Sequence, residues 1–169
     1  MSDFTPREQR EFDEAMHSLD KNMDALKNLF LQLPENNDLR ITSILIGASF
    51  ELFLDIALEF RFKTNKFSTL LMFDKKRQLA ESEKIISVFY SNDMALINNI
   101  RNLCAHNLEI NIEKVKTALY GTRTFERNKE LLKKEPLEKQ FRSVSLLAFN
   151  TIRQQYKDYI TKYLNDFNS

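Results

Sequence analysis

The string from Arg101 to His106 reads Arg-Asn-Leu-Cys-Ala-His and places three chemically active side chains within about one and a half helical turns. Arg101 is a permanent cation whose planar fork of N–H donors suits phosphate and carboxylate groups. His106 carries an imidazole, the group whose ordinary pKa lies nearest neutrality, so it can exchange protons. Asn102 adds an amide that donates and accepts hydrogen bonds. Together these side chains could hold an anion and transfer a proton beside it.

Helical spacing divides this segment into two faces. The apolar face consists of Ile97, Ile100, Leu103 and Cys104. The second face carries polar side chains and one small residue: Asn98, Arg101, Asn102, Ala105 and His106. Asn102 and His106 are neighbours at i, i+4, whereas Arg101 and His106 point about 140° apart around the helix axis. We therefore expect Arg101 to flank the pair, and a substrate lying across the helix or a second chain to complete the site.

A purely structural role fits the same side chains. An Arg and a His on a half-buried helix commonly form caps or ion pairs, and a protonated His near a helix C-terminus interacts favourably with the macrodipole. Neither role requires the particular combination Arg-Asn-x-x-Ala-His. In this interpretation Arg101 and His106 only bridge helices, and it stays open beside the functional one.

The segment from Ile100 to Asn107 resembles the Arg-x4-6-His signature of the HEPN superfamily, in which a polar residue commonly follows the Arg, as Asn102 does here. Abortive-infection (Abi-like) proteins carry a similar Arg-Asn-x-Cys-Ala-His string. A longer stretch, within residues 41–108, resembles the mannitol-operon-repressor-like (MtlR) proteins. Its matching parts are Ile44–Leu52, Phe60-Arg61, Lys84-Ile85 and the Arg-Asn-x-x-Ala-His string.

The HEPN resemblance implies a helical-bundle homodimer that cuts single-stranded RNA without a metal at the dimer interface, as a toxin or phage-defence effector. It makes Arg101, Asn102 and His106 the candidate catalytic residues. His106 would act as base on a ribose 2′-hydroxyl or as acid towards the leaving 5′ oxygen, and Arg101 would stabilise the phosphate charge. Asn102 would orient His106 or bind the phosphate. The residues expected to support the site are Glu51, Asp55, Asn98 and Ala105.

The MtlR resemblance implies a different function, a catalytically silent regulator that represses transcription through protein–protein contacts. We find no helix-turn-helix with an exposed basic recognition helix, so direct reading of DNA is not expected. A regulatory protein or an antitoxin is a possible partner under either resemblance.

Length and composition predict one all-α domain spanning residues 1–169. Only two Gly and three Pro interrupt a chain that is 43% apolar, which favours long helices and excludes a Gly-rich nucleotide-binding loop. One Cys allows no internal disulfide, and no Cys/His pattern has zinc spacing, so neither a metal nor a cofactor is expected. The polar N-terminus lacks an apolar signal region. These features predict a cytoplasmic protein.

The apolar run from Ile41 to Phe60 predicts a central helix. Glu51, Asp55 and Glu59 interrupt it at four-residue intervals, and each carboxylate would be costly in a bilayer, so no membrane span is expected. The three carboxylates share one face of the helix. We expect this stripe to meet the helix of Arg101, a partner chain or solvent.

The remaining patterns predict an up-down bundle of four long helices plus shorter ones. A capping box at Thr5–Glu8 opens a heptad seam that runs to Leu33. The further predicted helices are Lys75–Tyr90, a helix capped by Ser91 or Asn92 that carries Arg101, Asn111–Gly121, and Pro136–Phe167, with a charged, exposed segment at Glu126–Lys134.

Charge balance gives the chain no general attraction for nucleic acid, because 25 basic residues face 24 acidic ones. Any RNA site must therefore be local. The candidate local cations are Lys63, Lys66, Lys75, Lys76 and Arg77, and Arg123, Arg127, Lys129, Lys133 and Lys134. Charge runs of this kind usually form solvated surface, which is the alternative for all of them.

Overall fold

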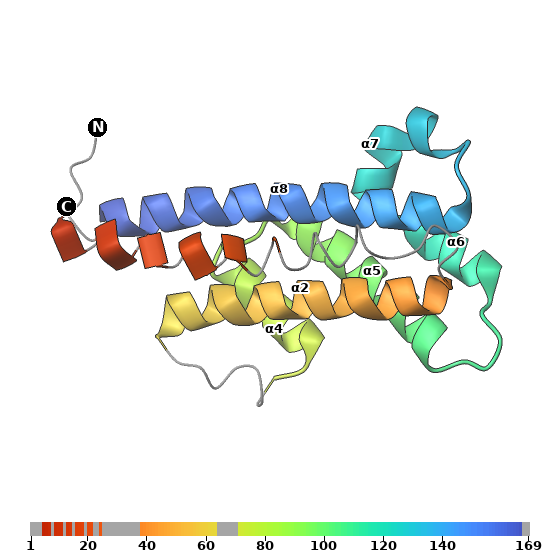
Figure 1. Cartoon of the computed structure of the whole chain (residues 1–169), viewed down its shortest axis with the longest axis horizontal. Coiled ribbons are helices and arrows are strands. Elements are labelled where there is room, and N and C mark those ends of the chain that lie inside the picture. The colour runs from red at the N-terminus through yellow and green to blue at the C-terminus, as the bar shows by residue number, and fades with distance from the viewer. Residues whose placement is uncertain are drawn as a thin grey trace.

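Three long helices run along the length of the molecule (Figure 1). The computed structural model describes residues 38–63 and 71–166, together with residues 5–7, 9–11, 13–14, 16–18, 20–21 and 24 of the N-terminal segment. The long helices are α2 (Leu39–Phe62), α5 (Val88–Ala105) and α8 (Leu137–Asp166). Regular structure in these described ranges is helical, without strands, which confirms the predicted all-α class.

Polar contacts between the long helices define their directions. Thr42, near the start of α2, donates to Glu138 near the start of α8 (3.4 Å), so these two helices run the same way. Arg40 at the start of α2 instead bonds the carbonyl oxygen of Asn107 just beyond the end of α5 (3.0 Å). Helix α5 is therefore antiparallel to α2, and the shorter helices α6 (Ile112–Tyr120) and α7 (Arg123–Leu132) gather at the end where α2 and α8 begin (Figure 1).

The predicted central helix is confirmed as α2. Its first turn is capped by Asp38, whose carboxylate accepts a hydrogen bond from the N–H of Arg40 (2.9 Å). The helix ends at Lys63, which adopts the left-handed conformation (φ 54°) common at helix C-termini. Its buried face meets α8 through edge-to-face aromatic pairs, including Phe50 with Phe149 at 5.3 Å between ring centroids.

Helix α2 is also the one helix in the described part of the chain whose length and composition would allow a membrane span. Its mean hydropathy over an 18-residue window is 1.8, and 56% of that window is buried inside the fold. The core helix of a soluble protein meets the same criterion, so length and composition do not by themselves indicate a span.

The predicted helix over Lys75–Tyr90 is wrong. The chain forms α4 (Phe73–Ser82), then a turn, and α5 begins at Val88 instead of after Ser91 or Asn92. Lys84 takes the left-handed conformation (φ 59°), and Ile85 and Ile86 after it are both buried. Adjacent side chains on a helix point about 100° apart, so the turn is what brings both isoleucines into the core.

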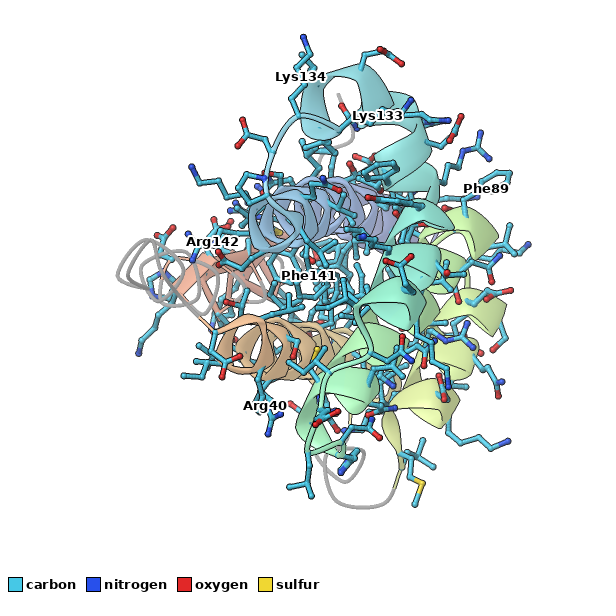
Figure 2. The ribbon with its side chains drawn as sticks, turned by 90° about the vertical axis from the view of Figure 1, so that its right-hand side faces the viewer. Arg40, Phe89, Lys133, Lys134, Phe141 and Arg142 are labelled. Carbon is cyan, nitrogen blue, oxygen red and sulfur yellow. The ribbon has the colours of Figure 1, made fainter. Side chains whose placement is uncertain are left out.

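The predicted short helix after the string is confirmed as α6. The side chain of Asn111 accepts from the N–H of Lys114 (3.0 Å), and the helix stops at Gly121. The predicted charged segment covers most of α7 and the residues after it: Leu132 is buried, whereas Lys133 and Lys134 just beyond the helix lie on the surface. Phe141 of α8 points inward (Figure 2). Most of the predicted heptad seam up to Leu33 lies outside the described residues.

Candidate functional site

Helix α5 separates its two faces as the spacing predicts. Ile97, Ile100 and Cys104 are buried in the core, and Leu103 packs against it. On the other face the side chains become more exposed towards the C-terminal end: Asn98 is buried, Arg101 and Ala105 are half-buried, and Asn102 and His106 are exposed. The string therefore lies at the border between core and solvent.

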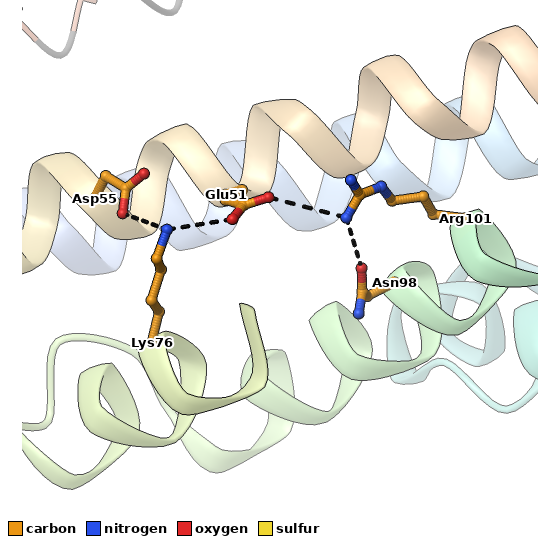
Figure 3. A network of polar contacts seen from close by, with 5 residues as sticks. All are labelled: Glu51, Asp55, Lys76, Asn98 and Arg101. Carbon is orange, nitrogen blue, oxygen red and sulfur yellow. Dashed lines mark hydrogen bonds and ion pairs between the residues drawn. The ribbon is translucent and has the colours of Figure 1, made fainter. Parts of the chain in front are cut away.

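Arg101 is held through one nitrogen of its guanidinium (Figure 3). Its Nη1 donates to Oδ1 of Asn98 one turn earlier (3.4 Å) and lies 3.9 Å from Oε2 of Glu51 on α2. The Nη2 and Nε atoms make no hydrogen bond or ion pair within the described part of the chain. Of the whole side chain, 31% is exposed, so Arg101 can still meet a ligand.

Gly47 makes room for Arg101 to cross α2. A Cβ atom at Gly47 would lie 2.3 Å from Cδ of Arg101, closer than carbon atoms approach. Any other residue would therefore push Arg101 aside. Sequence reasoning assigned no role to Gly47. The signal was a glycine inside a long helical pattern, which weakens the helix and usually has a packing reason.

Lys76 of α4 completes the network, and the prediction that it is a surface cation is wrong. Its side chain is 0% exposed, and Nζ lies 2.8 Å from Oδ1 of Asp55 and 3.2 Å from Oε1 of Glu51. Burial alone would lower the pKa of this amine, but the two carboxylates outweigh it and raise the pKa. Lys76 shares the buried face of α4 with Phe73 and Ala80, at i, i+3 and i+7, and that spacing is the signal that could have found it.

Arg77 is a second cation that the surface interpretation misplaced. Only 12% of its side chain is exposed, and Nη1 donates to the hydroxyl of Ser91 (2.6 Å). Ser91, expected as an N-cap, is instead buried within α5 and binds Arg77 there. The neighbouring Lys75 is exposed, as predicted.

His106 is the C-cap residue of α5 and lies in solvent. Its backbone N–H donates to the carbonyl of Asn102 (3.2 Å), while its imidazole makes no hydrogen bond or ion pair to any described residue. Arg40 holds the loop that follows, through the carbonyls of Asn107 (3.0 Å) and Leu108 (3.1 Å). Within one chain Arg101 turns towards α2, so the structure does not bring it together with His106.

The predicted site residues thus fall into two groups. The structure joins Glu51, Asp55, Asn98 and Arg101 into one network through Lys76, and the expected contact between the acidic stripe and the helix of Arg101 is made by Glu51. Asn102, Ala105 and His106 stand apart from this network. The role of both groups in catalysis stays a prediction.

Cys104, inside the string, does not belong to the reactive face. Burial raises the pKa of its thiol, which keeps it protonated and poorly nucleophilic at neutral pH. In the described ranges, no cluster of three or more His, Cys, Asp or Glu side chains is arranged to hold a metal ion.

Comparison with known proteins adds no relative: no protein-family model matches this chain, and no curated protein and no solved structure does so either. The HEPN resemblance therefore rests on the residues of the string, and the MtlR resemblance on the longer stretch within residues 41–108.

Proposed function

We propose that this chain is a HEPN-type endoribonuclease, which cleaves single-stranded RNA without a metal at a site shared by two chains of a homodimer. Its fold would be an up-down bundle in which the N-terminal segment supplies the fourth long helix. The observation that carries the proposal is that Arg101 and His106 point in different directions from one short string. Arg101 is anchored through Nη1 while 31% of its side chain is exposed, and the exposed His106 makes no imidazole hydrogen bond to any described residue.

The chemistry uses groups of both chains. Arg101 binds the scissile phosphate through the exposed part of its guanidinium, and a His106 imidazole takes the proton of the ribose 2′-hydroxyl. The 2′ oxygen forms a bond to phosphorus, and the bond between phosphorus and the 5′ oxygen breaks. An imidazolium returns a proton to that leaving oxygen, so the products end in a 2′,3′-cyclic phosphate and a 5′-hydroxyl.

The accessible ridge of α5 supports a two-chain site. Its members recur at helical spacing along the whole helix and include no Lys, Arg, Asp or Glu: Val88, Asn92, Ala95, Asn99, Asn102 and His106. A second copy can pack against such a ridge without removing permanent charges from water, which is the costly part of burying a polar surface. Contact between the C-terminal ends of two such ridges would bring the His106 imidazole of one chain near the Arg101 guanidinium of the other.

RNA cleavage by purified dimer tests the proposal. A fluorescently labelled single-stranded RNA is incubated with protein and excess chelator, and we expect cleavage that Arg101→Ala and His106→Ala each abolish while the dimer persists. His17→Ala is the matched control, since His17 is the other histidine and lies exposed in the N-terminal segment. RNA left intact by the wild-type dimer, or cleavage that survives His106→Ala, contradicts the proposal.

Mixing two inactive variants tests the sharing of the site. In a heterodimer of Arg101→Ala and His106→Ala chains, one of the two composite sites keeps both groups. Random exchange of equal amounts should therefore restore about a quarter of wild-type activity in a two-fold symmetric dimer. If the mixture stays inactive although heterodimers form, each site lies within one chain.

The alternative function is a catalytically silent regulator of the MtlR type. The ion pair between Arg101 and Glu51 favours it, because a guanidinium that links two helices has a structural role without any substrate. Such a regulator would leave RNA intact and would keep its complex with a partner protein after His106→Ala.

A further inference from the structure

The carboxylate of Glu51 is shared unequally between two cations (Figure 3). Its Oε1 lies 3.2 Å from Nζ of Lys76, whereas its Oε2 lies 3.9 Å from Nη1 of Arg101. Lys76 is also fully buried, while Arg101 is partly exposed. Since attraction between charges is stronger away from water, Lys76 dominates the orientation of this carboxylate.

Lys76 cannot easily leave this position. A buried ammonium is tolerated only when it is paired, and Lys76 is held from the other side by Asp55 at 2.8 Å. Two carboxylates and one ammonium therefore form a clamp between α2 and α4. Glu51 is the outer member of the clamp, the one that Arg101 meets.

The geometry at Arg101 shows the effect of this clamp. A free carboxylate beside a guanidinium commonly forms two parallel hydrogen bonds of about 2.7–2.9 Å. Glu51 instead approaches a single nitrogen at 3.9 Å and does not cover the fork. We infer that Lys76 is a positioning residue for Arg101: it retains Glu51 and so leaves the exposed part of the guanidinium open to a phosphate group. The inference rests on the proposed function, in which Arg101 binds the phosphate of RNA.

Variants of the network separate this role from simple support of the fold. The four groups Glu51, Asp55, Lys76 and Arg101 carry no net charge as two anions and two cations. Replacing Lys76→Met together with Asp55→Asn keeps that balance but leaves Glu51 with Arg101 as its one partner. Adding Glu51→Gln then also removes the carboxylate that competes with phosphate for Arg101. Lys75→Met is the matched control, because Lys75 is exposed beside Lys76 and makes no contact in the network.

Binding of inorganic phosphate is measured through the NMR signals of the Arg101 guanidinium N–H groups, which Arg101→Lys identifies by their loss. We expect the wild-type signals to shift with phosphate, and the Kd to rise about tenfold in the double variant, as one charge-assisted hydrogen bond is lost to Glu51. In the triple variant the Kd should return to the wild-type value or below. If the double variant does not fold, Lys76→Gln, which keeps a donor but no charge, replaces it with the same expectations.

A phosphate Kd in the folded double variant equal to that of the wild-type protein would overturn the inference, because Glu51 would then leave Arg101 open without Lys76. Arg101 signals that ignore phosphate in the wild-type protein would overturn it too. The proposed function fails separately: a wild-type dimer that binds phosphate at Arg101 but leaves RNA intact is not a ribonuclease, while Lys76 still keeps Arg101 open to an anion.

Discussion

Gly47→Ala should separate activity from stability at the candidate site. The new methyl group would lie 2.3 Å from Cδ of Arg101, and ordinary contact begins at 3.4 Å, so the side chain must retreat by about 1.1 Å. Cδ lies in the middle of the side chain, so the guanidinium moves with it. A displacement of about 1 Å at a reacting group costs up to about a hundredfold in rate, and we expect kcat/KM for RNA to fall by about that factor.

The stability of the same variant should change little. Alanine is favoured over glycine inside a helix by about 1 kcal/mol, which offsets the strain of moving Arg101. The assay pairs kcat/KM on single-stranded RNA with thermal melting. Gly121→Ala serves as the control, since a methyl group there meets Thr117 O at 3.3 Å and nothing in the network. Wild-type kcat/KM in a folded Gly47→Ala protein would refute the reasoning, because the placement of Arg101 would then not matter.

Three buried groups give the remaining predictions. At the start of α7, Asp93 accepts hydrogen bonds from the N–H of Arg123 (2.7 Å) and from the N–H and hydroxyl of Thr124 (3.0 and 2.6 Å). Asp93→Ala should therefore lower the free energy of unfolding, measured in urea, by about 2–4 kcal/mol. A loss below about 1 kcal/mol would contradict this capping role. The Tyr156 hydroxyl is buried without a hydrogen-bond partner in the described structure, so Tyr156→Phe should be neutral or stabilising by up to about 1 kcal/mol. Burial raises the pKa of Tyr156, so its contribution to stability is fully present below about pH 10 and is lost as pH rises above that value. Alkaline unfolding curves should show this fall in stability for the wild-type protein and not for Tyr156→Phe. Cys104 should react with thiol reagents at pH 8 only as fast as the protein opens, and rapid labelling of the folded protein would contradict its burial.

Features that depend on short stretches of chain could be predicted from the sequence. The apolar run of α2 predicts a helix through its continuity, and Asn111 and Gly121 predict the ends of α6 because a cap acts within its own turn. The two faces of α5 follow in the same way from the 3.6-residue repeat. The splay between Arg101 and His106 is therefore a local property that the sequence contains.

Features that depend on packing between helices could not be predicted in this way. In the run Lys75-Lys76-Arg77 the residue types are nearly alike, and the rotation of α4 against α2 decides that Lys76 is buried while Lys75 is exposed. The turn between α4 and α5 could not be predicted for the same reason. Its cause is the entry of Ile85 and Ile86 into a core formed by distant segments, and no proline or glycine marks it.

Both ends of the Arg-His string are held by α2. Arg40 binds the carbonyls just beyond His106, and Glu51, eleven residues later, meets Arg101, a separation of about 16.5 Å along a helix. Inserting or deleting one residue between these two contacts would rotate them by about 100° relative to each other and shift them by about 1.5 Å. The first three turns of α2 should therefore accept changes of apolar side chain more readily than any change of length.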